Sequence, residues 1–321
     1  MQPRSDAVRG RLASTPSEIP PRGWKDILLR IYSNISEHRV IELAAGVTFY
    51  SLLAIFPAIA ALVAIYGLFA DPAMLASQLN QLSGLLPAGA LDVIRNQLTR
   101  VASQRGSTLG LTFIVSLCVS LWSANAAMKS IFDTLNIVYA EREKRSFIVL
   151  NAISLAFTGA GIAFVLLAIG AMVALPVAIQ AVGLSNILGL VLRIGRWPAM
   201  FVIVALALAF IYRFGPSREK PQWRWISWGS VFAALAWIAA SVLFSWYASN
   251  FGSFNKTYGS LGAVIGFMTW IWLSAIVILI GAELDAEMEH QTARDTTTGD
   301  EKPTGDRGAT MADTLGGAQH R

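Results

Sequence analysis

Six long apolar runs constrain this 321-residue chain more than any other feature of its sequence. Each approaches or exceeds the roughly 20 residues that an α-helix needs to cross a hydrocarbon core. A helix satisfies its own backbone polar groups in lipid, and the runs lack the alternating pattern of barrel strands. The sequence therefore predicts an all-α, polytopic membrane helix bundle with six transmembrane helices. The predicted spans are residues 41–69, 109–132, 147–175, 197–214, 226–248 and 260–282.

The composition agrees with this class, because 55% of the residues are hydrophobic and only 14% are charged. Soluble domains carry about 25% charged residues. The balance therefore excludes a disordered chain and an ordinary soluble enzyme.

The segments outside the spans differ from one another. Residues 70–108, between the first two spans, place leucines at helical spacing on both sides of Pro87, which predicts an outer amphipathic helical segment. Residues 1–23 are polar and proline-rich, and we expect a flexible arm. Residues 24–290 form the predicted membrane domain, beginning with a short amphipathic helix at 24–39. Residues 291–321 have too little apolar content to fold alone, and we expect a disordered tail.

The distribution of basic residues predicts the orientation. Eighteen Lys and Arg residues lie in segments on the side of the two termini, and six lie in segments on the other side. This bias predicts that both termini are cytoplasmic. The net charge of +5 then reflects topology and contact with anionic lipid headgroups, so we expect lipid partners and no nucleic acid.

Ionisable side chains within apolar runs are the default functional candidates, because burying them in lipid is costly. Glu42 starts the first span, Lys129 and Asp133 share a helix face where they can pair, Asn136 follows, and Glu283 ends the sixth span. All lie near the inner interface. They can form local ion pairs at that boundary, or a polar vestibule facing the bundle interior, and both interpretations stay open.

Arg193 and Arg196 precede the fourth span on the outer side, against the general charge bias. They are candidate contacts for a lipid headgroup or another anionic group.

Signatures of enzymes and metal sites are missing from the sequence. Its three histidines lack metal-ligand spacing, and its single cysteine lies in an apolar run. The sequence has no Walker A lysine loop, GxSxG, HExxH or CxxC motif. The only dense acidic set follows the sixth span, where we expect it to be solvated. The sequence therefore predicts a protein that is not an enzyme and holds no metal or cofactor.

Four segments together resemble the YihY/BrkB family of bacterial inner-membrane proteins, over about residues 25–290. They are AAGVTFYSLLAIFP at 44–57, LNIVY at 135–139 followed by RSF at 145–147, YRFGP at 212–216, and YGSLG at 258–262 leading to GAELD at 281–285. Matching family positions are Phe49, Pro57, Asn136, Tyr139, Tyr258, Gly259, Gly281 and Glu283.

The resemblance implies a six-span inner-membrane protein, with a virulence label and a suggested role in moving envelope material. It brings no agreed catalytic residues, and the family's old name, ribonuclease BN, is widely regarded as a misassignment. The leading hypothesis is a transporter-like or flippase-like factor for an amphipathic or anionic envelope component. The alternatives are a structural or regulatory factor that contacts a partner protein through residues 72–103, and a membrane-bound ribonuclease, which no residue here supports. A homo-oligomer is compatible with each.

Overall fold

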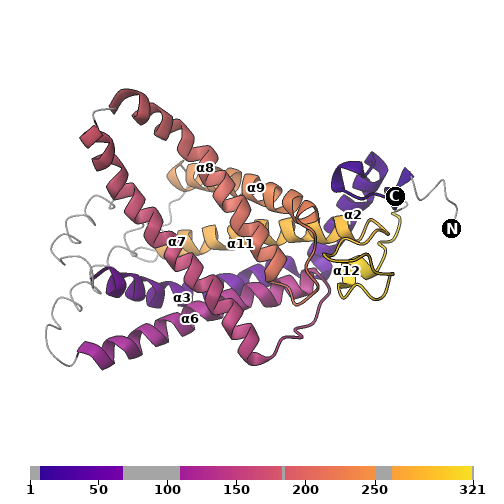
Figure 1. The fold of residues 1–321 in the computed structure, drawn as a ribbon, viewed down its shortest axis with the longest axis horizontal. Helices are drawn as coiled ribbons and strands as arrows, with labels where there is room; N and C mark the ends of the chain where they lie inside the picture. Colours follow the sequence, from indigo (N-terminus) through magenta and orange to yellow (C-terminus); the bar gives the residue numbers. More distant parts are fainter. Residues whose placement is uncertain (1–7, 68–108, 183–184, 251–261, 320–321) are drawn as a thin grey trace.

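The structure is a computed structural model that describes residues 8–67, 109–182, 185–250 and 262–319 (Figure 1). Within these residues it is helical, apart from one isolated antiparallel β-bridge between Pro221 and Thr297. The elements are η1 (Pro16–Glu18), α2 (Pro21–Glu37), α3 (Val40–Gly67), α6 (Leu109–Val138), α7 (Phe147–Val182), α8 (Ser185–Phe214), α9 (Trp223–Asn250), α11 (Gly262–Glu289) and α12 (Thr310–Asp313).

The described part of each predicted apolar run lies in one long helix, which confirms the all-helical class. Among the described residues, three helices contain stretches that are long and apolar enough to cross a membrane, at Phe147–Phe164, Trp223–Ala248 and Val264–Glu289. Shorter apolar stretches lie at Val40–Ala54 and Phe201–Phe214. A crossing by all six helices remains a prediction. The predicted outer amphipathic segment, 70–108, lies outside the described residues, and so does the surface on which the partner-protein hypothesis depends.

Several helices extend beyond the apolar spans predicted within them, and α8 and α11 do so in instructive ways. The fourth long helix begins at Ser185 rather than at 197 and passes through Pro198, as helices in apolar surroundings can when neighbouring groups satisfy the freed carbonyl. The sixth ends at Glu289 rather than at 282. Its last turns are polar in sequence, but neighbouring elements bury them, so the helix continues beyond the apolar run.

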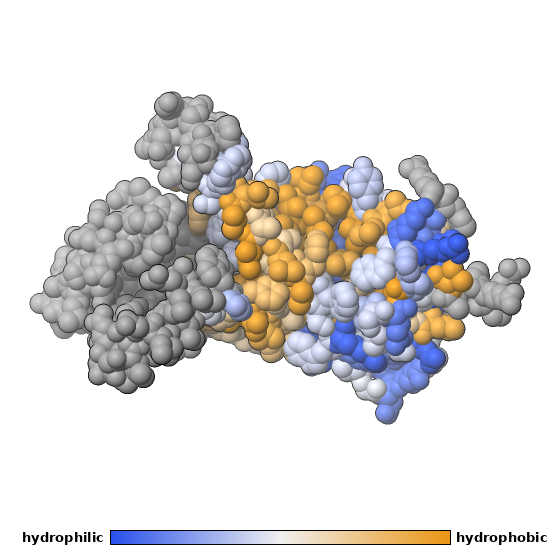
Figure 2. All heavy atoms as spheres, turned by 90° about the horizontal axis from the view of Figure 1, so that it is seen from above, coloured by the Kyte–Doolittle hydropathy of each residue, from blue (hydrophilic) through white to orange (hydrophobic). Residues whose placement is uncertain are grey.

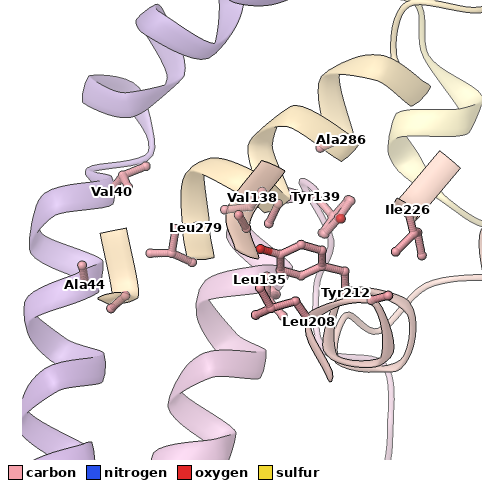
Figure 3. Close-up of a cluster of buried hydrophobic side chains, with 14 of the residues drawn as sticks. Val40, Ala44, Leu135, Val138, Tyr139, Leu208, Tyr212, Ile226, Leu279 and Ala286 are labelled. Atoms are coloured by element: carbon pink, nitrogen blue, oxygen red, sulfur yellow. The ribbon is translucent and has the colours of Figure 1, made fainter. Parts of the chain in front are cut away.

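The best-packed apolar core lies near one end of the bundle, where α3, α6, α8, α9 and α11 meet (Figure 3). Its fully buried side chains include Leu135, Tyr212 and Ile226. The Tyr212 hydroxyl donates a hydrogen bond of 2.6 Å to the carbonyl of Ile278, which ties α8 to α11. The same end also carries α2, α12 and both described terminal segments, which are rich in polar residues. We call it the polar end.

Both terminal segments fold at the polar end, so the expected flexible arm and disordered tail are wrong for residues 8–23 and 291–319. Ala13 and Ile19 are buried in a small apolar cluster with Trp225 and Met288. The Ala293 N–H donates to the Arg11 carbonyl at 2.8 Å. The tail is polar, but hydrogen bonds to the arm and to residues 218–222 replace the apolar core that it lacks. Figure 1 shows both terminal segments at this one end.

The surface divides in the same direction. Figure 2 shows hydrophobic residues gathered around the middle of the molecule and hydrophilic residues at the polar end. Exposed apolar side chains on the long helices are typical of surfaces that face lipid rather than water. They include Leu53, Ile148, Val202, Leu206, Val242, Leu243 and Trp246.

Two glycines set the closest approach of α9 and α11. A Cβ atom on Gly281 would lie 2.6 Å from the Cβ of Ala233 and 2.7 Å from the hydroxyl of Tyr212. A Cβ on Gly229 would lie 2.3 Å from the carbonyl oxygen of Gly281. Small residues let helix backbones meet at this distance. Gly281, one of the family positions, therefore serves helix packing.

We expect Gly281→Ala to destabilise the fold by about 1–3 kcal/mol, the usual cost of overpacking a filled site. Gly266→Ala is the matched control, because it lies on the same helix and its Cβ would meet nothing within 4 Å. Denaturant titration of the purified protein in detergent measures both variants. Equal unfolding midpoints would contradict the close approach.

Candidate functional site

Four carboxylates in the last turns of α11 are buried, so the expectation of a solvated acidic set is wrong. Because they lie on different sides of the helix, they meet different neighbours. Asp285 accepts a hydrogen bond of 2.7 Å from the Gly229 N–H of α9. Arg218 donates two hydrogen bonds of 2.9 Å to Glu289. The exposed fractions are 0%, 0%, 3% and 0% for Glu283, Asp285, Glu287 and Glu289.

The other two carboxylates hold α2. Glu287 pairs with Arg30, and Asn34 donates to Glu287 at 2.8 Å and to Glu283 at 3.3 Å. The His38 Nδ1 lies 2.5 Å from Glu283 Oε1. The predicted site residue Glu283 therefore anchors the amphipathic helix rather than lining an opening.

Asn136 joins two loops at the polar end. Its Oδ1 accepts a hydrogen bond of 2.7 Å from the Ser217 N–H, and its Nδ2 donates to Glu143 at 3.1 Å. Burial raises the pKa of Glu143, but hydrogen bonds from Arg145 and Asn136 outweigh burial and lower this pKa to about 2. Arg145 also donates to the Gly215 carbonyl at 2.8 Å. Residues 139–146 are thereby fixed to the segment that follows α8.

Lys129 does not form the predicted ion pair with Asp133. Its Nζ donates to Asn151 Oδ1 of α7 at 3.1 Å and lies 5.2 Å from the centre of the Trp122 ring, whereas Asp133 is exposed. Side chains on a helix lean towards its N-terminus, so Lys129 reaches the turn before it rather than the turn that carries Asp133. Asn125 Nδ2 donates to the same Asn151 oxygen at 3.1 Å.

The contacts of the described residues divide the five predicted polar side chains. Glu283 contacts α2, Asn136 contacts the loops, and Lys129 contacts α7, while Glu42 and Asp133 are exposed. Within the described part of the chain, none of the five lines the two cavities identified at the polar end or the one between α3, α6 and α11.

The structure describes the side chains of only some of the remaining predicted residues. Arg193 and Arg196 lie in α8, but their side chains are outside the described set, so the anion contact stays a prediction. The same holds for the Pro57 side chain, and Tyr258 and Gly259 fall in the undescribed segment 251–261. Phe49 is exposed. Tyr139 is fully buried, with the Arg218 guanidinium 4.0 Å above its ring.

Sequence reasoning missed a basic cavity of about 690 Å³ where α7 begins and α8 ends. Its lining combines cations with aromatic and aliphatic side chains from segments far apart in the sequence. The YRFGP segment with Lys220 nearby was the available signal, but the sequence does not show that α7 closes the other side. The lining residues are Lys144, Arg145, Ile153, Ala156, Phe157, Arg213, Phe214, Pro216, Ser217, Arg218, Glu219, Lys220 and Gly308. We call this space the basic cavity.

The contact between His38 and Glu283 makes stability depend on pH. The hydrogen bond to Glu283 raises the pKa of His38 above its ordinary value of 6.5, although burial opposes the rise. A group with a raised pKa in the folded state contributes its full stabilisation below its ordinary pKa and loses it as the pH rises through the raised pKa.

We therefore expect the melting temperature in detergent to decrease as the pH rises from about 6.5, the ordinary histidine pKa, through the raised pKa. His38→Gln should flatten this part of the profile, whereas Ser33→Ala, on the exposed face of α2, should retain it. A His38→Gln profile identical to that of the wild type would refute the role of this contact.

Comparison with known proteins finds several bacterial relatives of this chain. The chain is 29% identical over 267 residues to YfkH of Bacillus subtilis (strain 168), whose name describes it as ribonuclease-like; the match covers 81% of this chain and 94% of that protein. It is 26% identical over 312 residues to a UPF0761 membrane protein of Alkalilimnicola ehrlichii, with 91% and 66% covered. A UPF0761 membrane protein of Neisseria meningitidis serogroup B is 26% identical over 273 residues, with 81% and 62% covered.

The chain thus spans just under two thirds of the length of these UPF0761 relatives. No solved structure matches it. The family model described as virulence factor BrkB matches residues 31–305, which include the six long helices of the described residues and part of the polar end. The chain is therefore a member of the BrkB family of membrane proteins.

Proposed function

We propose that the chain is a bacterial inner-membrane protein that crosses the bilayer six times with both termini in the cytoplasm. The six long helices, the hydrophobic middle and the position of both terminal segments at one end support this topology. The excess of basic residues at that end supports its cytoplasmic orientation.

We propose further that the protein is a transporter-like or flippase-like factor for an anionic amphiphile of the envelope. The environment of Lys129 carries this proposal. Its ammonium group lies on an apolar helix, bonds to an amide of α7, and has no carboxylate within 4.0 Å among the described residues. A cation with no carboxylate at ion-pair distance in such surroundings is costly, and it attracts anionic groups.

The polar surroundings of Lys129 extend further along α7. Asn151, Ser154 and Thr158 are at most 8% exposed and recur at the spacing of one helix face. On α6, Asn125 is fully buried, and its Oδ1 has no hydrogen-bond partner. Buried polar atoms are normally satisfied, so a free acceptor beside a lysine is consistent with a site that receives a polar group.

We do not propose ribonuclease activity for this chain, although the name of one relative describes it as ribonuclease-like. A nuclease needs carboxylates or histidines arranged to hold a metal ion or to activate water. The described residues contain no group of three or more potential metal ligands, and the α11 carboxylates are already bonded to α2, α9 and Arg218.

A flux assay tests the transport proposal. In proteoliposomes, we expect wild-type protein to speed transbilayer movement of fluorescent phosphatidylglycerol, and Lys129→Gln to slow it about tenfold, the effect of losing one charge-assisted hydrogen bond. Arg22→Gln, an exposed cation on α2, is the control and should retain the wild-type rate. An equal rate in Lys129→Gln, or no movement above empty liposomes, would reject the proposal.

Terminal tags test the topology. Tags at Met1 and Arg321 should both resist an impermeant reagent in intact spheroplasts, and both should react in inverted vesicles. A tag that reacts in spheroplasts would place that terminus outside and overturn the proposed orientation.

A further inference from the structure

The basic cavity has two chemically different walls. One is apolar and comes from Ile153, Ala156 and Phe157, within the Phe147–Phe164 stretch that is long and apolar enough to cross a membrane. The other is polar and comes mainly from residues 213–220, where α8 ends. Its volume of about 690 Å³ is typical of small-molecule sites, which span about 300–1,000 Å³. The cavity therefore lies at the boundary between the apolar and polar parts of the protein.

Three of the five cations that line the cavity are neutralised. Lys144 pairs with Glu141 at 2.7 Å, Arg145 with Glu143 at 2.7 Å, and Arg218 with Glu289 at 2.9 Å. The other two, Arg213 and Lys220, have no carboxylate within 4.0 Å among the described residues. The single carboxylate in the lining, Glu219, is exposed. The cavity therefore retains positive charge that the protein does not balance.

Arg213 is held in place without an anion. It is 9% exposed, donates to the Pro221 carbonyl, and lies 4.4 Å from the centre of the Trp223 ring. Its Nε is buried without a hydrogen-bond partner. Buried nitrogens of this kind are rarely left unsatisfied, and a guanidinium group offers the planar fork that matches phosphate oxygens. The side chain is thus positioned for an anionic ligand that supplies the missing acceptor.

We infer that the basic cavity binds the phosphate headgroup of an anionic membrane lipid. Arg213 and Lys220 contact the phosphate, and the α7 wall with Phe214 contacts the beginning of the acyl chains. The inference rests on the proposed function for its class of ligand, so its test measures binding separately from flux.

A lipid fits the lining better than free phosphate. Free phosphate would make no favourable contact with the apolar side chains of Ile153, Ala156 and Phe157. A phospholipid would contact the polar wall with its headgroup and the apolar wall with its acyl chains. Lys220 is exposed, with its Nζ 5.5 Å from the centre of the Phe214 ring, so its charge lies directly beside an apolar contact. Basic pockets between membrane helices on the cytoplasmic side commonly bind lipid headgroups.

Native mass spectrometry of the full chain in a neutral detergent tests this site. Phosphatidylglycerol and phosphatidylcholine of the same chain length are titrated separately. We expect the wild type to bind phosphatidylglycerol at least about tenfold more tightly, and Arg213→Gln to lose most of that preference, since one charge-assisted hydrogen bond carries about this factor. Lys220→Gln, at an exposed position, should weaken binding without affecting folding.

The controls separate the sources of phosphate and the two proposals. Arg213→Lys should retain part of the preference, and Arg22→Gln should retain all of it. Inorganic phosphate at millimolar concentration should displace little lipid. Equal affinity for the two lipids, a preference unchanged in both Arg213→Gln and Lys220→Gln, or full displacement by phosphate would each overturn the lipid site. Loss of the preference in Arg213→Gln supports the site even where the flux assay shows no transport.

Discussion

The burial of four carboxylates at the end of α11 is the constraint on which the polar end depends. A buried charge without a partner costs several kcal/mol, so each carboxylate requires a donor from another part of the chain. Glu283 and Glu287 recruit α2, Asp285 recruits the backbone of α9, and Glu289 recruits Arg218. One helix end thereby fixes the positions of three neighbouring elements. Buried ion pairs of this kind contribute little to the net free energy of folding, so their main effect is on how these elements are oriented.

The same constraint shapes the basic cavity. Glu289 holds Arg218 and Asn136 holds the Ser217 backbone, so the segment after α8 is rigidly placed against the beginning of α7. These contacts occupy Glu289 and Asn136, and the one carboxylate in the lining, Glu219, is not within 4.0 Å of Arg213. Among the described residues, the Arg213 guanidinium contacts the Pro221 carbonyl and the rings of Trp223 and Phe214. Two guanidinium nitrogens in the lining, Nε of Arg213 and Nε of Arg218, are buried without a hydrogen-bond partner in the part of the chain that the structure describes, but only Arg218 has a carboxylate at ion-pair distance there.

The helices could be predicted from the sequence because their signal is local. An apolar run of about 20 residues is sufficient by itself to indicate a membrane-type helix. The terminal segments could not be predicted in this way, because they fold through bonds such as that of Thr292 to the Ala13 carbonyl, 279 positions apart. The acceptor for Lys129 lies on another helix, so sequence spacing favoured Asp133 instead of Asn151. The basic cavity was missed for the same reason, since its two walls meet only in three dimensions.

Four of the eight family positions lie at the polar end, and their contacts show what these four share. Asn136 bonds to Ser217, Tyr139 lies beneath Arg218, Gly281 meets Gly229, and Glu283 meets His38. Each of these contacts joins two elements, and none leaves a reactive group exposed. These four positions therefore serve the assembly of the polar end. Because Asn136 and Tyr139 also contact Ser217 and Arg218 in the wall of the basic cavity, a substitution at either position would alter both the packing of the polar end and the ligand site.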